Sequence, residues 1–199
     1  GMKVLCLDLE GVLVPEVWQA VASRTGVQAL EKTTRDIPVY DDLMKYRLQI
    51  LDEYDIHLSL IQEEIAKLEP LQGAVEFLHW ARQRFQIAIV SDTFYEFGMP
   101  LMQRLGYPQL LCHTLEVQDD RVVGYTLRQE DPKRQVVKAF KSLEYTVFAA
   151  GDSFNDVNML EEADQGFFYC APENVIAQFP QFPCTENYAQ LQDRLSGIG

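Results

Sequence analysis

Four short apolar runs, rich in β-branched and aromatic side chains, constrain the fold of this chain more than any other feature. They are VLCLDL (4–9), IAIVS (87–91), TVFAA (146–150) and GFFYC (166–170). Runs of this length and composition are typical of strands that are buried on both faces of a parallel sheet. Apolar positions at helical spacing precede each of the last three runs. The sequence therefore predicts an α/β fold with a central parallel sheet.

The first two predicted strands are too far apart for a single helical crossover. Residues 14 to about 72 carry several helix patterns and no strand run, which indicates a small helical cap lobe inserted after the first strand. We therefore expect a catalytic core of residues 2–13 and 73–199 and a helical cap of residues 14–72. Residues 111–128 alternate apolar and polar side chains around DDR, which predicts a β-hairpin.

The charge balance excludes several classes of partner. The 199 residues include 17 Lys and Arg against 30 Asp and Glu, a formal net charge of -13, which repels nucleic acids and anionic lipid surfaces. The four cysteines show no CxxC spacing, no window is apolar enough for a membrane span, and no basic-then-apolar signal pattern begins the chain. We expect a soluble, cytoplasmic protein, and the sequence leaves its oligomeric state open.

Polar side chains follow three of the predicted strands at the point where each strand ends. Because the carboxyl ends of parallel strands meet at one edge of a sheet, where ligands bind, we expect these side chains to share one site. Asp8 and Glu10 are two residues apart, so both side chains leave the same face of an extended segment. The residues concerned are Asp8, Glu10, Ser91, Asp92, Asp152, Asn155 and Asp156.

Such a site needs positive charge to be stable. Asp8, Glu10 and Asp152 place three carboxylates together, and their repulsion is offset by protons or by a hard cation. Mg²⁺ is the expected cation, because it prefers oxygen ligands and commonly takes only a couple of carboxylates. The segment DPKR (131–134) predicts a helix that starts at Pro132 after an Asp131 cap, with Lys133 in its first turn beside any bound anion.

These features resemble the four motifs of the haloacid dehalogenase superfamily, which occur here in order as DLEGV (8–12), the Ser91 turn, Lys133 and GDSFND (151–156). The resemblance implies a Rossmann-like core and Mg²⁺-dependent phosphoryl transfer through an aspartyl phosphate. Further stretches, such as RVVGY and FPQFP, are similar to members that hydrolyse phosphoserine or transfer its phosphoryl group to homoserine. This similarity extends from about residue 3 to residue 188.

The resemblance also implies a role for each site residue. Asp8 would be the nucleophile and Glu10 the acid and base, although phosphatases of the superfamily usually carry Asp at this second position. The metal would be held by Asp8, the backbone carbonyl of Glu10 and Asp152, and Asp156 would support the metal ligands from behind. The phosphate would be surrounded by Ser91, Asp92 through its amide, Lys133 and Asn155.

Arg47 and Glu16 are the candidates for binding the amino acid end of a substrate. Arg47 lies inside the apolar stripe of a predicted helix, YDDLMKYRLQIL, where its planar guanidinium can bind a carboxylate; Glu16 could bind an ammonium. The alternatives are that Arg47 pairs with an acid such as Asp36 or lays its stem along the surface. Two other functions stay open: a phosphatase for another small phosphoester, and an inactive phosphate-binding module. His57, His79 and His113 share no ligand spacing and are interpreted as structural.

Overall fold

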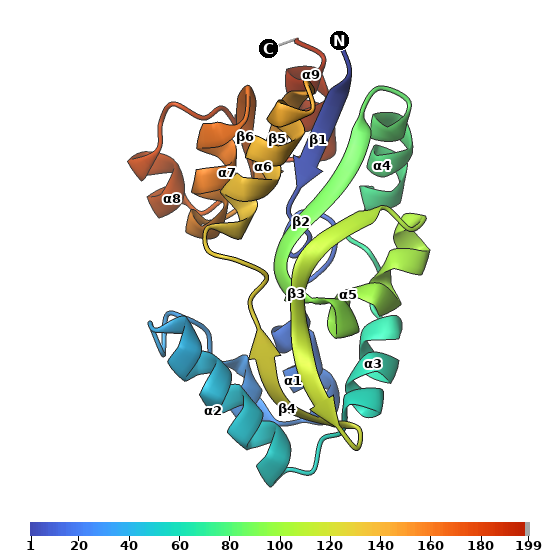
Figure 1. Ribbon diagram of the computed structural model, residues 1–199, viewed down its shortest axis with the longest axis vertical. Helices are drawn as coiled ribbons and strands as arrows, with labels where there is room; N and C mark the ends of the chain where they lie inside the picture. Colours follow the sequence, from blue (N-terminus) through green and yellow to red (C-terminus); the bar gives the residue numbers. More distant parts are fainter. Residues whose placement is uncertain (198–199) are drawn as a thin grey trace.

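A seven-stranded sheet forms the centre of the protein, and a helical lobe lies beyond one end of its strands (Figure 1). The computed structural model describes residues 1–197. The strand order is β4-β3-β2-β1-β5-β6-β7, and neighbouring strands are parallel except for β3 and β4. The strands are β1 (Lys3–Leu7), β2 (Gln86–Phe94), β3 (Gln109–Gln118), β4 (Arg121–Thr126), β5 (Thr146–Gly151), β6 (Gln165–Tyr169) and β7 (Cys184–Thr185).

The four apolar runs form β1, β2, β5 and β6, which confirms the predicted parallel sheet. β1 is enclosed on both edges, because Leu5 pairs with Ile87 of β2 and with Phe148 of β5. The first part of β3 adds a parallel strand beside β2, and the two-residue β7 adds one beside β6. Two residues are too few for the alternation or apolar content that marks a strand in a sequence.

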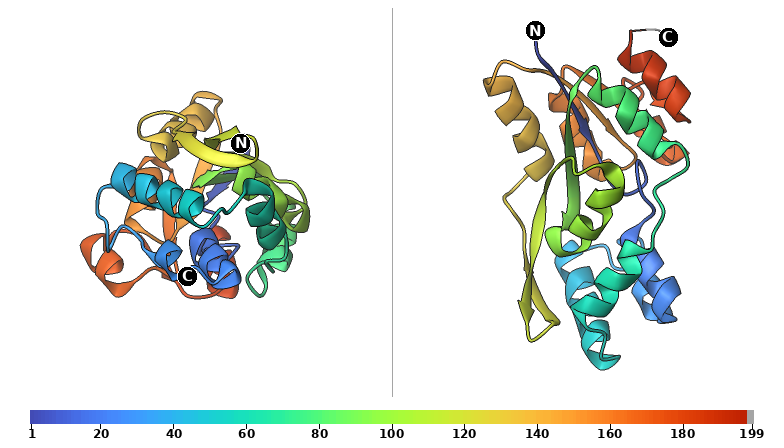
Figure 2. Two further views of the ribbon diagram at one scale, coloured as in Figure 1. Left: turned by 90° about the horizontal axis from the view of Figure 1, so that it is seen from below. Right: turned by 90° about the vertical axis from the view of Figure 1, so that its right-hand side faces the viewer.

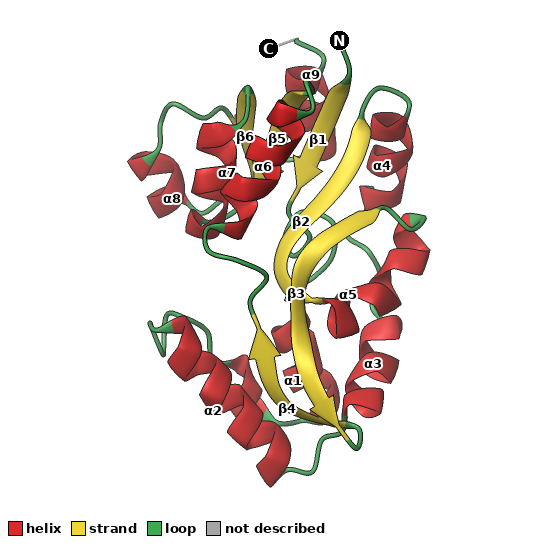
Figure 3. Ribbon diagram, viewed as in Figure 1, coloured by secondary structure: helices red, strands yellow, loops and turns green. Residues whose placement is uncertain are grey.

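Helices cover both faces of the sheet, as Figure 3 shows. Because side chains alternate along a strand, Leu5 and Leu7 of β1 face one layer while Val4 and Cys6 face the other. The first layer contains α4 (Ala74–Arg82), α5 (Tyr95–Met102) and α9 (Tyr188–Leu195), and the second contains α6 (Pro132–Ser142), α7 (Val157–Glu162) and α8 (Glu173–Gln178). None of the helices within residues 1–197 is both long and apolar enough to cross a membrane.

The helical lobe lies beyond the carboxyl ends of the strands, as Figure 2 shows most clearly in its right-hand view. It is built from α1 (Val17–Thr25), α2 (Tyr40–Glu53) and α3 (Leu58–Ala66), with a short 3-10 turn at Gln28–Glu31. Its two connections to the sheet are joined to each other, since the amide of Leu71 donates to the carbonyl of Leu13 at 2.9 Å. One continuous apolar cluster includes side chains of the lobe and of the sheet.

The β3–β4 hairpin confirms the predicted hairpin and connects the sheet with the helical lobe. Its turn residues Asp119 and Asp120 both have left-handed backbones, with φ of 49° and 63°, the geometry that matches the twist of two paired strands. The carboxylate of Asp120 accepts the amide of Ser59 in α3 at 3.0 Å, and Arg121 contacts Asp52 of α2 at 3.4 Å. The division into a core and a cap of residues 14–72 stays a prediction, and this hairpin is a second link between those two parts.

Candidate active site

A cavity of about 280 Å³ lies between the carboxyl ends of the strands and the helical lobe. Every site residue expected from the sequence lines this cavity except Asp156, which is fully buried. The cavity residues expected from the sequence are Asp8, Glu10, Glu16, Arg47, Ser91, Asp92, Lys133, Asp152 and Asn155. The lobe also contributes side chains that were not among the expected site residues, namely Trp18, Thr33, Thr34, Tyr40 and Leu43.

Asp8 stands at the end of the central strand. The amide of Asp8 donates to the carbonyl of Ala150 at 3.1 Å, which continues the pairing of β1 with β5 by one residue. Its Oδ1 accepts the amide of Leu9 at 2.8 Å, so the carboxylate is fixed by its own turn. Burial raises the pKa of Asp8 well above its usual value, the charge of Asp156 adds to this, and Lys133 offsets only part of it.

Lys133 is the cation at the centre of the site. Its Nζ lies 2.6 Å from Asp156 Oδ1, 3.3 Å from Asp8 Oδ1 and 3.7 Å from Asp92 Oδ2, and its side chain is only 5% exposed. Burial disfavours the charged form, but the surrounding acids outweigh burial and raise the pKa of Lys133 well above its usual value. A buried positive charge is therefore held beside the proposed nucleophile.

The helix that carries Lys133 starts where the sequence predicted, but it is capped differently. Asp131 occupies the N-cap position and Pro132 the first helical position of α6. The carboxylate of Asp131 does not accept a hydrogen bond from the helix amides. It accepts instead from Arg134 at 2.9 Å and from Asn158 of α7 at 2.8 Å, so Asp131 ties α6 to α7.

Asp8, Asp152 and Asp156 form a compact acidic group, with one carboxylate oxygen of each lying within 4.8 Å of the others. Both carboxylate oxygens of Asp156 already accept hydrogen bonds: Oδ1 from Lys133, and Oδ2 from the amides of Asp152 at 2.8 Å and Ser153 at 3.1 Å. Burial, followed by the charge of Asp156, raises the pKa of Asp152 to about 6. The carboxylates of Asp8 and Asp152 are thus the oxygen donors best placed for a hard cation such as Mg²⁺.

Gly11 makes room for this acidic group. Its backbone is left-handed, with a φ of 82°, and a Cβ built on it would overlap the carboxylate of Asp152. Glycine is the residue that meets both demands, because it has no side chain and adopts positive φ without strain. The glycine of the DLEGV motif therefore allows Asp152 to approach the loop that follows Asp8.

Glu10 and Arg47 lie on the side of the cavity nearer the lobe. Burial and the charge of Glu16 raise the pKa of Glu10 to about 8. Arg47 is only 5% exposed, its guanidinium lies 4.7 Å from the centre of the Trp18 ring, and it donates to the carbonyl of Lys32 at 3.2 Å. Within residues 1–197 no acid lies within 4.0 Å of the Arg47 guanidinium, and its Nε makes no hydrogen bond.

The two alternatives for Arg47 have a clear outcome in the structure. Asp36 does not pair with Arg47; its carboxylate accepts a hydrogen bond from the amide of Thr33 at 3.0 Å. Arg47 is buried, so its stem does not lie along the surface. Glu16 is exposed and occupies the N-cap position of α1 at the mouth of the same cavity.

Ser91 and Asp92 lie near the carboxyl end of β2, where its pairing with β3 becomes irregular. The Oγ of Ser91 accepts the amide of Thr93 at 3.1 Å. One carboxylate oxygen of Asp92 lies 3.2 Å from His113 Nε2, a contact that the sequence did not indicate. His113 was interpreted as structural because it belongs to no ligand motif, and only the parallel pairing of β3 with β2 brings it to this site.

Comparisons with known proteins agree with this geometry. Residues 16–161 match the family model of the haloacid dehalogenase-like hydrolases. The chain is 64% identical over 192 residues to phosphoserine phosphatase ThrH of Pseudomonas aeruginosa, covering 96% of this chain and 94% of that protein. It is 59% identical over 193 residues to a phosphoserine phosphatase of Pseudomonas syringae pv. tomato, covering 96% of this chain and 81% of that protein.

A solved structure has the same fold despite a low sequence identity. This structure, described as a phospho-aspartyl intermediate analogue of phosphoserine phosphatase, superposes with a TM-score of 0.79 at 20% identity and covers 100% of this chain and 99% of that one. The order of the motifs, the sheet topology and the match over residues 16–161 lead to one assignment. This chain belongs to the haloacid dehalogenase-like hydrolases.

Proposed function

We propose that this protein is a Mg²⁺-dependent phosphoserine phosphatase that forms an aspartyl phosphate on Asp8. The observation that carries the proposal is the placement of Asp8 beside Lys133, at 3.3 Å, in a cavity that also contains the unpaired cation Arg47. The first cation suits a phosphoryl group and the second suits a carboxylate. The names of the two Pseudomonas relatives support the same substrate.

The donor set fits a bound Mg²⁺. Asp8 and Asp152 supply carboxylate oxygens, and burial raises the pKa of both because Lys133 offsets only part of the cost of their charges. The backbone carbonyl of Glu10 is proposed as a third ligand, and Asp156 keeps Asp152 oriented through its amide. When bound, Mg²⁺ supplies positive charge that lowers the repulsion between the carboxylates and the phosphate.

In the proposed first step, a carboxylate oxygen of Asp8 attacks the phosphorus of phosphoserine. The bond between phosphorus and the serine oxygen breaks, and Glu10 gives its proton to that oxygen. Burial raises the pKa of Glu10 to about 8, which favours the protonated carboxyl group at neutral pH and suits it to act as the acid. Ser91, the amide of Asp92, Lys133 and Asn155 are proposed to hold the phosphate oxygens during the transfer.

In the second step, Glu10 takes a proton from an incoming hydroxyl group, which attacks the phosphorus of the aspartyl phosphate. The bond to Asp8 breaks and the carboxylate is regenerated. When water is the acceptor, the product is inorganic phosphate. We propose homoserine as a second acceptor, which would give phosphohomoserine; this part rests on the resemblance of motifs across residues 3–188 to phosphotransferases of the family.

Arg47 and Glu16 are proposed to bind the carboxylate and the ammonium of the substrate. A buried guanidinium without an acid partner is costly, and a substrate carboxylate would supply the missing charge. A phosphatase for a sugar or nucleotide phosphate would not need this pair, so the unpaired state of Arg47 favours an amino acid phosphate over that alternative. The inactive phosphate-binding module is disfavoured, because Asp8, Lys133 and Asp152 are all present at one site.

The test is phosphate release from phosphoserine with Mg²⁺, compared with sugar phosphates and nucleotide monophosphates. Phosphoserine should be the preferred substrate, and Asp8→Asn should abolish turnover while the protein remains folded. Added homoserine should divert part of the phosphoryl group into phosphohomoserine. Preference for another phosphoester would contradict the assignment of the substrate.

All four cysteines are free thiols, which supports our further expectation that the enzyme works in the reducing cytoplasm.

A further inference from the structure

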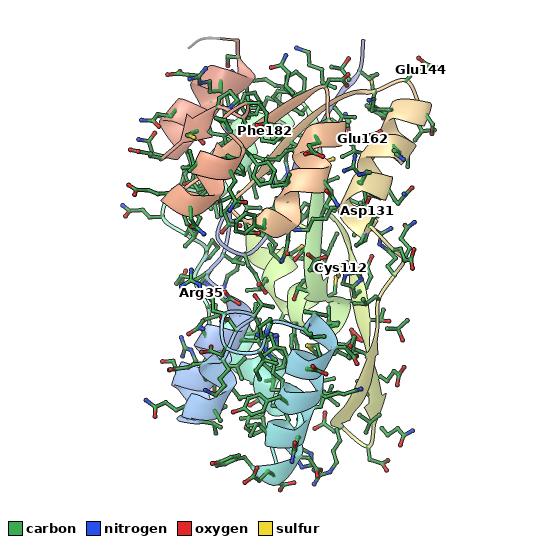
Figure 4. The ribbon with its side chains drawn as sticks, turned by 90° about the vertical axis from the view of Figure 1, so that its left-hand side faces the viewer. Arg35, Cys112, Asp131, Glu144, Glu162 and Phe182 are labelled. Carbon is green, nitrogen blue, oxygen red and sulfur yellow. The ribbon has the colours of Figure 1, made fainter. Side chains whose placement is uncertain are left out.

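A buried histidine links the hairpin to the proposed phosphate site. His113 lies in β3 and is 3% exposed; its neighbour Cys112 is labelled in Figure 4 at the level where the sheet meets the lobe. The Nδ1 of His113 accepts the amide of Arg128 at 2.8 Å. Its Nε2 lies 3.2 Å from Oδ1 of Asp92. The ring thus connects the base of the hairpin with the end of β2.

The first of these contacts fixes the proton of the ring. Because Nδ1 accepts a hydrogen bond from Arg128, the neutral imidazole carries its proton on Nε2 and donates it to Asp92. Burial by itself would raise the pKa of Asp92, but the hydrogen bond from His113 and the charge of Lys133 outweigh burial and lower it. Asp92 is therefore an ionised carboxylate whose Oδ1 is held by His113 and whose Oδ2 faces Lys133.

The place of this carboxylate raises an electrostatic difficulty. Asp92 lines the cavity, its side chain is 35% exposed, and its other oxygen, Oδ2, lies 3.7 Å from Lys133 Nζ. The same cavity wall, with Ser91 and Lys133, is where the phosphate is proposed to bind. In the observed orientation Oδ2 stays 3.7 Å from Lys133 Nζ. A carboxylate that rotated freely could approach Lys133 more closely, where it would repel a phosphate dianion and compete with it for this cation.

We infer that His113 is a positioning residue that holds the carboxylate of Asp92 in one orientation, so that it cannot rotate into the volume that the phosphate oxygens need. This inference rests on the proposed phosphate site. His113 does not touch the substrate; it acts through Asp92. The hydrogen bond from Arg128 is what makes the hold specific, because it prevents the ring from turning and removing its Nε2 proton from Asp92.

Two substitutions separate the contacts of the ring. The side-chain oxygen of asparagine takes the place of Nδ1, so His113→Asn keeps an acceptor for the Arg128 amide and removes the donor to Asp92. The amide of glutamine reaches the place of Nε2, so His113→Gln keeps the donor and loses the acceptor. A role confined to the hairpin base would make His113→Gln the more damaging change, whereas the inference makes His113→Asn the more damaging one.

The readout is the binding of inorganic phosphate in the presence of Mg²⁺, measured by calorimetry, with the melting temperature of each variant as the control for folding. His113→Asn should weaken phosphate binding about tenfold through the freed charge of Asp92, and the KM for phosphoserine should rise in parallel with a smaller change in kcat. His113→Gln should bind phosphate nearly as wild type does. Adding Asp92→Asn to His113→Asn should restore phosphate binding, because the intruding charge is gone.

Unchanged phosphate binding in a folded His113→Asn variant would overturn the inference, as would a loss that Asp92→Asn does not restore. If His113→Asn does not fold, Asp92→Glu and Asp92→Asn test the same point. The longer carboxylate no longer fits the position held by His113, so Asp92→Glu should weaken phosphate binding more than Asp92→Asn does; equal losses would overturn the inference. Phosphate binding as expected without phosphoserine turnover would contradict the proposed function and leave this inference standing.

Discussion

At the scale of single residues, the site depends on how closely three carboxylates can approach one another. Asp156 lies within reach of Lys133 and two backbone amides, and this allows it to be fully buried. Asp8 and Asp152 lack such full compensation, and burial raises the pKa of both. This difference between neighbouring acids separates the residue that supports the site from the two that are available to a cation.

Gly11 offers a direct test of that crowding. Gly11→Ala places a Cβ against the carboxylate of Asp152, so Asp152 must move and the concentration of Mg²⁺ needed for half-maximal activity should rise about tenfold or more. Gly26→Ala is the matched control, because Gly26 is also left-handed, with a φ of 74°, but nothing lies within 4 Å of the added Cβ. A similar Mg²⁺ requirement in both variants would show that backbone strain alone is responsible.

Arg47 allows a second prediction about a single residue. Phosphoethanolamine is phosphoserine without its carboxylate, so it isolates the contact that Arg47 is proposed to make. Arg47→Ala should raise the KM for phosphoserine about 10- to 100-fold, the range for losing a hydrogen bond to a charged group, and should change the KM for phosphoethanolamine little. Steady-state kinetics with both substrates decides this. Equal increases for the two would mean that Arg47 supports the lobe and not the carboxylate.

Most residues at the site could be predicted because strand ends are visible in a sequence. Asp8 and Asp152 each lie at the end of an apolar run, and parallel strands bring their ends together. His113 could not be predicted, since its contact with Asp92 depends on the register of β3 against β2. The cavity side chains Trp18 and Tyr40 depend in the same way on how the lobe packs.

At the scale of elements, the pattern of apolar residues was sufficient for the strands at the centre of the sheet and insufficient at its edges. β1 and β5 are buried on both faces and read as continuous apolar runs. The sequence indicated the start of β3 only as part of a hairpin. Its parallel pairing with β2 joins residues that are far apart in the sequence, so no local pattern indicates it. Where β3 continues past its pairing with β2, it pairs with β4, and the turn between them contacts the lobe.

The turn of this hairpin gives a prediction about an element. Asp119 and Asp120 both have left-handed backbones, but only Asp120 contacts the lobe, by accepting from the amide and hydroxyl of Ser59. Alanine at either position carries the same type of backbone strain. Asp120→Ala should therefore unfold at a lower temperature than Asp119→Ala in a thermal melt. Equal melting temperatures would show that the contact between the hairpin and α3 contributes nothing to stability.

At the scale of the whole molecule, a net charge of -13 surrounds a site that is proposed to bind an anionic substrate. At the site, Lys133 and Arg47 supply positive charge, and under the proposal Mg²⁺ adds to it. Both cations are buried, so water and salt screen them less than surface charges. Under the proposal, the overall negative charge disfavours polyanions, while Lys133, Arg47 and a bound Mg²⁺ supply the positive charge that a small phosphoester needs.

The metal-free protein should lose stability as the pH rises from 6 to 8. Burial raises the pKa of Asp152 to about 6 and that of Glu10 to about 8, above the values that these groups have in an unfolded chain. The folded state therefore binds more protons than the unfolded state in this window, and its stability falls as the pH increases. Melting temperatures should decrease from pH 6 to pH 8, and Mg²⁺ should raise them most at pH 8. A melting temperature that increases over this range without metal would contradict the prediction.

The central claim is that the phosphoryl group passes through Asp8. Rapid mixing of the enzyme with phosphoserine and Mg²⁺, followed by acid quenching and peptide mass spectrometry, tests it most directly. The account predicts a phosphorylated peptide that contains Asp8, formed before phosphate is released and absent from the Asp8→Asn variant. Full phosphate release with no phosphorylated Asp8 at any time, or with the phosphoryl group on another residue, would contradict the account.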